Sequence, residues 1–269
     1  AYSEAKKEVE IGQFFTPPPL CEFVMACLKP SEMDLVADLT CGMGNFFNYV
    51  PVQSNAYGCE LDPNAYKVAR YLYPKAALTQ GDIRTYAPEQ RFDYVVGNPP
   101  FHLHWSLEDG TEMNSQLYYC LKAAQLLKPL GILAVIVPAS FLADSFSDGS
   151  AIKRMETYFG FLGQIALPPE TFRALGVDSF PTKLQFWQKK NISWDNRSGR
   201  YSTECPAPSL PLTRPAEEAE PTYRQYIQPA KAALEQNRSH VLLELSRERA
   251  TSKNFIYKVQ KLLYQIKCH

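Results

Sequence analysis

The 269-residue sequence lacks the features that mark secreted, membrane-spanning and zinc-binding proteins. Its seven cysteines are odd in number and include no Cys-x-x-Cys pair, which argues against a disulfide framework and against a zinc site. Apolar runs such as Ile132–Val137 are too short to cross a membrane, and residues 1–10 contain no apolar signal region. We therefore expect a cytoplasmic protein. The first residue is not methionine, which leaves open that the sequence is part of a longer chain.

The sequence also lacks net charge, which on its face disfavours a nucleic-acid partner. The charge is unevenly distributed, however. Residues 221–269 contain nine Lys or Arg and three Glu, a net charge of +6, so the remainder has a net charge of −6. A basic end on an acidic body is a weak indication of a polyanionic partner, and a solvated helical tail explains the same charges equally well.

What the sequence does contain is an alternation of strand and helix signals. Helical patterns start at Thr16 with Pro17 and Pro18, at Asp62-Pro63 and at Ser115, and Thr16 is a plausible N-cap. Strands that alternate with helices predict an α/β fold, a mostly parallel sheet with helices on both faces. Ligands of such sheets bind at the carboxyl ends of the strands. The expected strands are Leu35–Leu39, Ala56–Leu61, Ala76–Thr79, Tyr94–Val96, Ile132–Val137, Phe161–Ala166 and Leu184–Trp187.

The composition changes after about residue 190. Residues 206–221 contain five prolines and are typical of a linker. Beyond them the sequence predicts two helical stretches, the second with an apolar stripe between Phe255 and Ile266. We therefore expect a domain over 1–190, a proline-rich linker over 191–221, and a basic helical tail over 222–269 that is a candidate for the start of a further domain.

Three consecutive expected strands end in residues that suit a nucleoside ligand. After the first strand, Gly42 and Gly44 allow a tight turn and the close approach of a ligand. The turn does not match the dinucleotide fingerprint Gly-x-Gly-x-x-Gly, because residue 47 is Phe. Glu60 ends the second strand, where a carboxylate can accept from ribose hydroxyls, and Asp82 ends the third, where it can accept from an exocyclic amine.

A fourth expected strand runs into the tetrapeptide Asn98-Pro99-Pro100-Phe101, where two prolines must end it. An amide, a rigid backbone and an aromatic ring therefore follow this strand, at the same edge of the sheet as Glu60 and Asp82.

From residue 11 to residue 189, the chain resembles the S-adenosylmethionine-dependent N6-adenine DNA methyltransferases, including the modification subunits of type I restriction systems. The resemblance rests on GQFFTP (12–17), DLTCGMGNF (38–46), Glu60, Asp82, NPPF (98–101) and LLKPLGILAVIVP (126–138). Leu130 departs from the family pattern, which has glycine there. The residues 172–187 resemble the end of the family domain, with a hairpin into the last strand.

The resemblance implies a Rossmann-like methyltransferase sheet with an antiparallel last strand, S-adenosylmethionine as cofactor, and double-stranded DNA as substrate, in a restriction-modification or related system. It implies no metal, and a separate target-recognition domain or subunit as a candidate partner. The implied catalytic residues are Asn98, Pro99 and Phe101. The implied cofactor-binding residues are Phe15, Thr16, Asp38, Cys41, Gly42, Gly44, Asn45, Phe46, Glu60, Leu61, Asp82, Ile83 and Asn98.

The resemblance implies methyl transfer to an exocyclic amine, which is a poor nucleophile because its lone pair is delocalised into the aromatic base. The side-chain carbonyl of Asn98 and the backbone carbonyl of Pro99 can accept its two N–H groups and localise that lone pair, and the prolines stiffen the loop. Phe101 can stack on a base flipped from a duplex.

Other functions remain open on the sequence. An NPPF loop followed by histidine is also similar to ribosomal RNA guanine-N2 methyltransferases, and NPPY-type loops occur in enzymes that methylate protein glutamine. A methyltransferase fold that has lost activity and acts as a scaffold is the non-enzymatic alternative. His102 and His104 flank the loop without a carboxylate or cysteine partner, so we expect them to line the substrate cleft or face solvent rather than bind metal.

Overall fold

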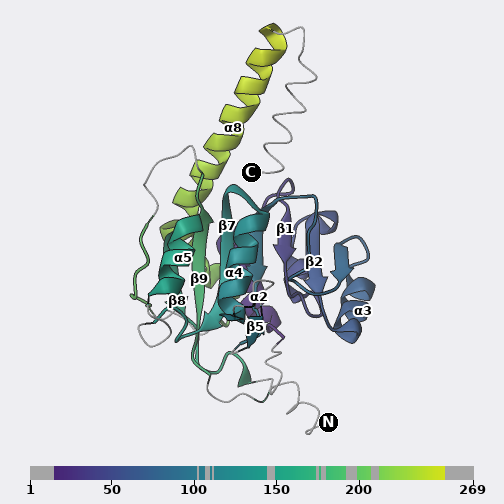
Figure 1. Cartoon of the computed structure of the whole chain (residues 1–269), viewed down its shortest axis with the longest axis vertical. Helices are drawn as coiled ribbons and strands as arrows, with labels where there is room; N and C mark the ends of the chain where they lie inside the picture. Colours follow the sequence, from purple (N-terminus) through teal and green to yellow (C-terminus); the bar gives the residue numbers. More distant parts are fainter. Residues whose placement is uncertain are drawn as a thin grey trace.

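The computed structural model describes residues 15–101, 103–106, 110, 112–143, 149–173, 176, 180–191, 199–206 and 212–251, and for helix residues 241 and 244–251 it describes the backbone alone. Its centre is a seven-stranded sheet with strand order β3-β2-β1-β4-β7-β9-β8 (Figure 1). The strands of this sheet are β1 (Val36–Asp38), β2 (Ala56–Glu60), β3 (Ala77–Gln80), β4 (Phe92–Gly97), β7 (Leu127–Pro138), β8 (Phe159–Ala166) and β9 (Thr182–Lys189).

The sheet confirms the predicted α/β class and the predicted strand directions. β3, β2, β1, β4 and β7 are paired in parallel, whereas β9 is antiparallel to both β7 and β8. The last strand in the chain is therefore the antiparallel one, and it lies between two others rather than at an edge. A two-stranded hairpin of β5 (His104–Ser106) and β6 (Glu112–Asn114), which the sequence analysis did not predict, follows β4.

Helices cover both faces of the sheet, as predicted. One face packs against α2 (Pro18–Leu28) and a C-terminal group made of α6 (Pro215–Glu218), α7 (Glu220–Thr222), the π-helical turn η4 (Tyr223–Ile227) and the start of α8 (Gln228–Thr251). The other face packs against α4 (Ser115–Leu126) and α5 (Ser150–Tyr158), which lie in front of the sheet in Figure 1. The remaining elements are α3 (Pro63–Leu72) beside β2 and β3, and the short 3₁₀ helices η1 (Asn45–Tyr49) and η2 (Gln53–Asn55).

The predicted helix starts differ in their outcome. Asp62 caps α3, since its side chain accepts hydrogen bonds of 2.8 Å from the amides of Asn64 and Ala65. The prediction that Thr16 caps α2 is wrong. The N-cap is Pro17, Pro18 is the first helical residue, and no side chain caps the helix. A capping hydroxyl accepts a hydrogen bond from a backbone N–H group of the first turn, and the prolines there have none.

Leu130, the position at which the chain departs from the family pattern, has a backbone φ of +63°. This left-handed conformation costs a non-glycine residue roughly 1–2 kcal/mol. The leucine side chain is nevertheless buried. Leucine at this position therefore adds strain to the backbone and also adds apolar packing, which glycine would not provide.

Residues 199–206 and 212–238 pack on the sheet, although a linker and a separate tail were expected from the sequence there. The amide of Phe161 on β8 donates to the carbonyl of Gly199, and the amide of Ala166 donates to that of Pro206, both at 2.8 Å. Further along, Ile227 and Ala230 are buried in the core cluster that also contains α2. The division into three parts stays a prediction, but at least residues 199–206 and 212–238 contribute to the packing of the expected first domain.

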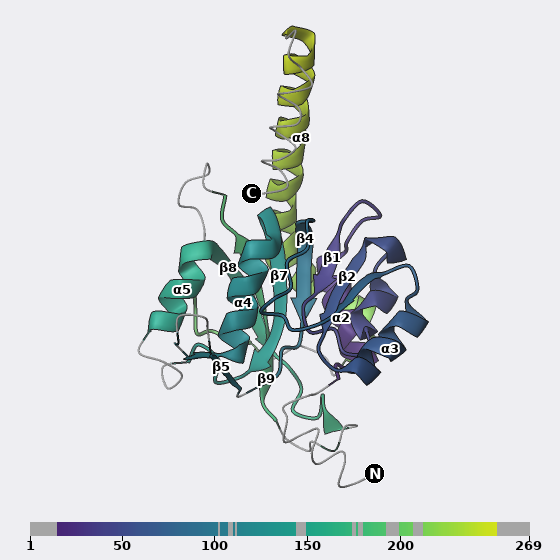
Figure 2. The same ribbon diagram turned by 45° about the vertical axis from the view of Figure 1, so that its right-hand side comes forward.

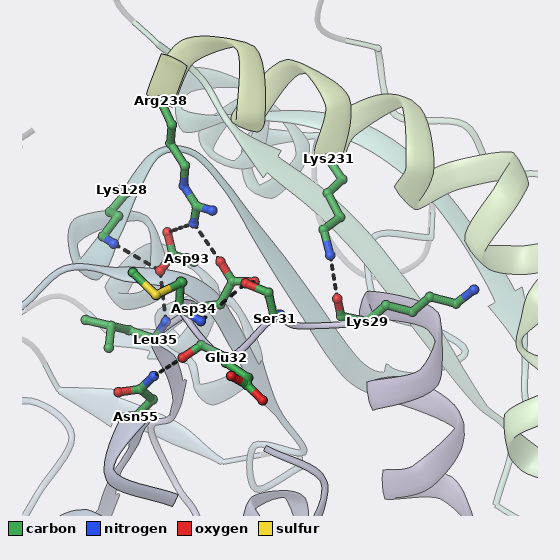
Figure 3. A network of polar contacts seen from close by, with 11 residues as sticks. Lys29, Ser31, Glu32, Asp34, Leu35, Asn55, Asp93, Lys128, Lys231 and Arg238 are labelled. Carbon is green, nitrogen blue, oxygen red and sulfur yellow. Dashed lines mark hydrogen bonds and ion pairs between the residues drawn. The ribbon is translucent and has the colours of Figure 1, made fainter. Parts of the chain in front are cut away.

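Helix α8 is fixed to the sheet by a group of buried ion pairs at the edge where the parallel strands begin (Figure 3). The guanidinium of Arg238 contacts Asp34, just before β1, at 2.7 Å and also contacts Asp93 on β4. Both carboxylates are almost fully buried, and Lys128 on β7 adds a second cation 2.9 Å from Asp93. From this edge α8 projects away from the sheet, as Figures 1 and 2 show.

Candidate active site

The turn after β1 is held by the acid at the end of β2, as their strand-end positions predicted. The carboxylate of Glu60 accepts hydrogen bonds of 2.7 Å from the amide of Gly42 and of 2.7 Å from the amide of Asp62. Gly42 has a φ of +55°, and a Cβ atom there would lie 2.9 Å from the ring of Phe15. Glycine is therefore required at 42 both by its backbone and by the aromatic ring that covers it.

Two adjoining pockets lie at the carboxyl ends of the parallel strands. The larger, a cavity of about 180 Å³, extends from Glu60, Leu61, Asp82 and Ile83 toward Leu103 and Trp105. The smaller contains Thr16, Asp38, Cys41, Met43, Asn45 and Phe46. Four residues line both pockets, and they mark the place where the two meet. They are Phe15, Thr40, Gly42 and Asn98.

The smaller pocket is polar and is built by the predicted cofactor residues. Asn45 donates from its side chain to the carbonyl of Thr16 at 2.8 Å, which ties the 3₁₀ helix η1 to the segment before α2. Asp38 is buried, and this burial raises the pKa of its carboxyl to about 7, an effect to which the nearby Glu60 carboxylate adds. The amide of Thr40 donates to Asp38 at 3.1 Å and opposes the rise. Cys41 donates from its amide to the carbonyl of Cys59 on β2.

The hydroxyl of Thr40 is buried at the junction of the pockets and has no hydrogen-bond partner within the described part of the chain. A buried hydroxyl without a partner is costly, so its position argues for a polar ligand group at the junction. The sequence analysis did not name Thr40. Its place directly after Asp38 and Leu39 at the end of β1 was the available signal.

The larger pocket has a charged rim and an apolar interior. Asp82 accepts three hydrogen bonds from the Arg84 side chain, at 2.5 to 3.0 Å, and these bonds hold its pKa below the usual range. Ile83 is buried, whereas Leu61 is 65% exposed at the pocket mouth. The predicted acid is therefore present, but it is paired with Arg84, a residue that the sequence analysis missed.

The NPPF loop follows β4 and divides into two environments. Asn98 and Pro100 line the larger pocket, and the carbonyl of Pro100 accepts a 2.6 Å hydrogen bond from the hydroxyl of Ser115, which fixes the loop on α4. Phe101 is 3% exposed and stacks on Phe180, with ring centroids 5.5 Å apart and planes 13° from parallel. In this arrangement neither Pro99 nor Phe101 is among the residues that line the pockets. The role of Phe101 as a stacking partner for a base stays a prediction.

The prediction for the two histidines beside the loop can be checked for His104 alone. His104 lies on β5 with an exposed side chain, and His102 lies outside the described residues. The described residues include no group of three His, Cys, Asp or Glu side chains that could hold a metal ion. No helix in that same part of the chain is long and apolar enough to span a membrane.

Comparison with known sequences assigns a family to most of the chain. The profile of the family described as N-6 DNA Methylase matches residues 1–198. Defense against restriction protein B of Escherichia phage P1 is 28% identical over 185 residues, which cover 63% of this chain and 8% of that protein. The type II methyltransferase M.CvrRI of Paramecium bursaria Chlorella virus XZ-6E is 27% identical over 151 residues, which cover 52% of this chain and 40% of that enzyme. The chain thus spans less than half the length of either relative.

A solved structure shows the same fold. The methyltransferase subunit of a type I restriction-modification system from Streptococcus thermophilus superposes with a TM-score of 0.59 at 17% sequence identity. The superposition covers 78% of this chain and 54% of that subunit. At this identity the likeness supports the Rossmann-like arrangement of the sheet and its helices, and nothing finer.

Proposed function

The chain belongs to the N-6 DNA methylase family, and from this premise we propose that it transfers a methyl group from S-adenosylmethionine to the N6 atom of an adenine in DNA. The observation on which the proposal rests is the junction of the two pockets. Asn98 lies at that junction, together with Thr40 and Gly42. A ligand that extends through both pockets would therefore have its middle beside the residue proposed to hold the acceptor base.

The residues present fit S-adenosylmethionine. Glu60 has unused lone pairs on both carboxylate oxygens and can accept from ribose hydroxyls while it holds Gly42 and Asp62. Ile83 and Leu61 offer apolar contacts for the adenine ring, and Asp82 offers an acceptor for its amine. The methionine part would contact Asp38, Thr40 and the Thr16–Asn45 pair in the smaller pocket.

We assign three tasks to the chain's own residues. They accept the N–H groups of the target amine, orient its lone pair and exclude water from it. When bound, S-adenosylmethionine supplies an electrophilic methyl group on a sulfonium. Asn98 accepts one N–H of the target amine through its side-chain carbonyl, and the Pro99 carbonyl accepts the other, so that the nitrogen lone pair points at that methyl group. The bond from Ser115 to Pro100 and the rigidity of the two prolines keep these acceptors in place before the base arrives.

The target base is proposed to leave the duplex, because an amine inside the stack cannot reach Asn98. Phe101 is the proposed stacking partner, which requires its ring to separate from Phe180. Sequence recognition is proposed to come from another domain or subunit, since the described residues outside the sheet and its covering helices are few. A setting within a restriction-modification or related system, and a cytoplasmic location, belong to the same proposal.

The test is to incubate the protein with radiolabelled S-adenosylmethionine and, in separate reactions, duplex DNA, ribosomal RNA or a protein mixture, and then to identify the methylated atom. The expected product is N6-methyladenine in DNA. N2-methylguanine in RNA or methylglutamine in protein would transfer the assignment to one of the other methyltransferases with a similar loop. Binding of the cofactor without any product, with DNA that includes candidate recognition sites, would instead indicate a scaffold.

A further inference from the structure

A buried tyrosine hydroxyl lies between the two loops of the candidate site. Tyr119 is on α4, and its side chain is 0% exposed. Its hydroxyl accepts a 3.2 Å hydrogen bond from the amide of Leu39 at the end of β1 and donates a 2.5 Å hydrogen bond to the carbonyl of Val96 at the end of β4. Neither the proposed binding of the cofactor nor the proposed chemistry uses this residue.

The hydroxyl stands where the pairing of β1 with β4 ends. The last paired residues are Asp38 and Val96. The amide of the next residue, Leu39, and the carbonyl of Val96 are groups of the kind that a parallel ladder joins directly. Here the hydroxyl is hydrogen-bonded to both groups, so that the side chain of Tyr119 connects the two strands at the point where their pairing ends.

This connection matters because each strand leads directly into one of the loops. β1 leads through Leu39 to Thr40 and Gly42, and β4 leads through Gly97 to Asn98. We propose that Tyr119 is a positioning residue that sets the separation between the loop that binds the methyl donor and the loop that holds the acceptor base. The inference rests on the proposed function, and it adds a residue that touches neither ligand.

Gly97 provides independent support for the same arrangement. A Cβ atom at residue 97 would lie 2.0 Å from the Tyr119 hydroxyl oxygen and 2.6 Å from the ring carbon that bears it. Contacts this short do not occur between real side chains, so Tyr119 can occupy its place only because residue 97 is glycine. The backbone beside Asn98 is therefore shaped around the tyrosine.

The position of the Tyr119 hydroxyl can also be tested through the pKa of Asp38, which lies beside it. Its Oδ1 atom lies 3.4 Å from the oxygen of the Tyr119 hydroxyl. Asp38 is therefore a second acceptor for this hydroxyl, more distant than the Val96 carbonyl at 2.5 Å. A hydrogen bond from the hydroxyl favours the ionised carboxylate and so lowers the pKa of Asp38 against the larger effect of burial. Other titratable groups also face Asp38 from the surrounding elements. They are Glu60 and Cys59 on β2, Cys41 in the adjoining loop and Cys21 on α2.

The test is the variant Tyr119→Phe, which keeps the ring and removes only the hydroxyl. At saturating S-adenosylmethionine and DNA, we expect the single-turnover rate of methyl transfer to fall by about tenfold or more, because small displacements of reacting groups are costly. The dissociation constant for S-adenosylmethionine should change by less than about threefold, since the hydroxyl contacts no ligand. Thermal unfolding, measured first, should show a folded protein.

The matched control is Tyr94→Phe. Tyr94 is also fully buried, and it lies on β4, but within the described residues its hydroxyl has no hydrogen-bond partner. Removing that hydroxyl should leave the transfer rate at the wild-type value. A rate for Tyr119→Phe that matches the control, or that falls only in step with cofactor affinity, would overturn the proposal.

A second measurement, the titration of Asp38, needs no substrate. The carboxyl carbon of Asp38, assigned in a ¹³C-aspartate spectrum by comparison with Asp38→Asn, should titrate at a higher pH in Tyr119→Phe than in the wild type or in Tyr94→Phe. Asp38 directly precedes Leu39, so an unchanged midpoint would show that the hydroxyl does not act at the end of β1, and this would overturn the proposal. If the wild-type protein methylates no substrate at all, the proposed function fails, while this titration still decides whether the hydroxyl acts on the loop.

Discussion

The carboxylate of Glu60 and the amide of Gly42, 18 residues apart in the chain, are joined by a 2.7 Å hydrogen bond. The acid at the end of β2 therefore fixes the glycine turn at the end of β1 before any ligand arrives. Burial raises the pKa of this carboxyl, and the two amides that it accepts from oppose the rise. The same side chain is thus a support for the turn and a candidate acceptor for a ribose.

Glu60→Ala should weaken binding of S-adenosylmethionine by about 1.5–3 kcal/mol, because it removes a charged acceptor. The Gly42 turn also loses its support, so the loss should lie toward the upper end. Isothermal titration calorimetry measures it, with Glu32→Ala as control, since the exposed Glu32 side chain lies at the opposite edge of the sheet. Equal affinities in Glu60→Ala and the wild type would show that Glu60 does not bind the cofactor.

Asn98→Ala should abolish methyl transfer to adenine while S-adenosylmethionine binding stays within about 1 kcal/mol of the wild type, because Asn98 acts mainly on the acceptor base. Single-turnover assays and calorimetry give the two values. Asn55→Ala is the control, since that amide bonds to the carbonyl of Glu32 far from the site. Transfer by Asn98→Ala at the wild-type rate would contradict the proposed chemistry.

Asp38→Asn should make the protein more stable than the wild type, and increasingly so as the pH rises from about 4 to 7. The folded pKa of Asp38 is raised from 3.8 to about 7, so folded Asp38 keeps a proton that the unfolded chain releases. Its contribution to stability is therefore present in full below about pH 4 and is lost as the pH rises through 7. Above pH 7 the difference should level off at a value on the order of 2–4 kcal/mol. Urea unfolding across a pH series measures this, and a constant difference would show that Asp38 is already ionised.

Arg238→Ala should destabilise the fold by about 2–4 kcal/mol, because it leaves two buried carboxylates with one fewer cation. Burial alone would raise the pKa of Asp34, but bonds from Ser31 and Arg238 lower it overall. The matched control is Arg224→Ala, which breaks the exposed ion pair with Glu220 and should cost much less, because solvent screens that pair. Denaturant unfolding compares the two variants, and equal losses would show that the Arg238 cluster adds no particular stability.

Two truncations test the C-terminal region. Deletion of residues 222–269 should destabilise or unfold the protein, because it removes the buried Ile227 and Ala230 and the ion pairs of Arg238. Deletion of residues 252–269 should leave the fold intact. If those residues contact phosphates, the shorter deletion should also lower DNA affinity and flatten its dependence on salt. Equal slopes in a salt series would show that they do not.

Each of the seven apolar runs expected as strands overlaps an observed strand, because the buried strands of such a sheet are continuous apolar runs. The bounds were predicted less well, since β7 begins at Leu127 and the expected strand at Ile132. It did not predict the β5–β6 hairpin, whose strands have three residues each and include exposed polar side chains. It also predicted the start of α4 at Ser115, but it gave no sign that the hydroxyl of Tyr119 on that helix would reach β1 and β4.

The site was predicted as a set of strand ends, which is the part that topology determines. The residues that line both pockets include three of the predicted set, Phe15, Gly42 and Asn98, together with Thr40. What could not be predicted depends on tertiary contacts between distant residues. The stacking of Phe101 on Phe180 is of this kind. The pairing of Asp82 with Arg84 is local, since the two residues are two positions apart, and it was missed because only the acid was considered as a ligand.

The ion pairs of Arg238 with Asp34 and Asp93 can form only late in the synthesis of the chain. Asp34 leaves the ribosome 204 residues before the arginine that neutralises it. At about 5–20 residues per second, that interval is roughly 10–40 s, and Asp93 and Lys128 are both added within it. Until Arg238 follows, Lys128 is the one member of this group that can oppose the two carboxylates. The carboxylates can remain hydrated or protonated until α8 emerges. The final closure of this edge is therefore a late event, and the residues that match the family profile would be synthesised before it can occur.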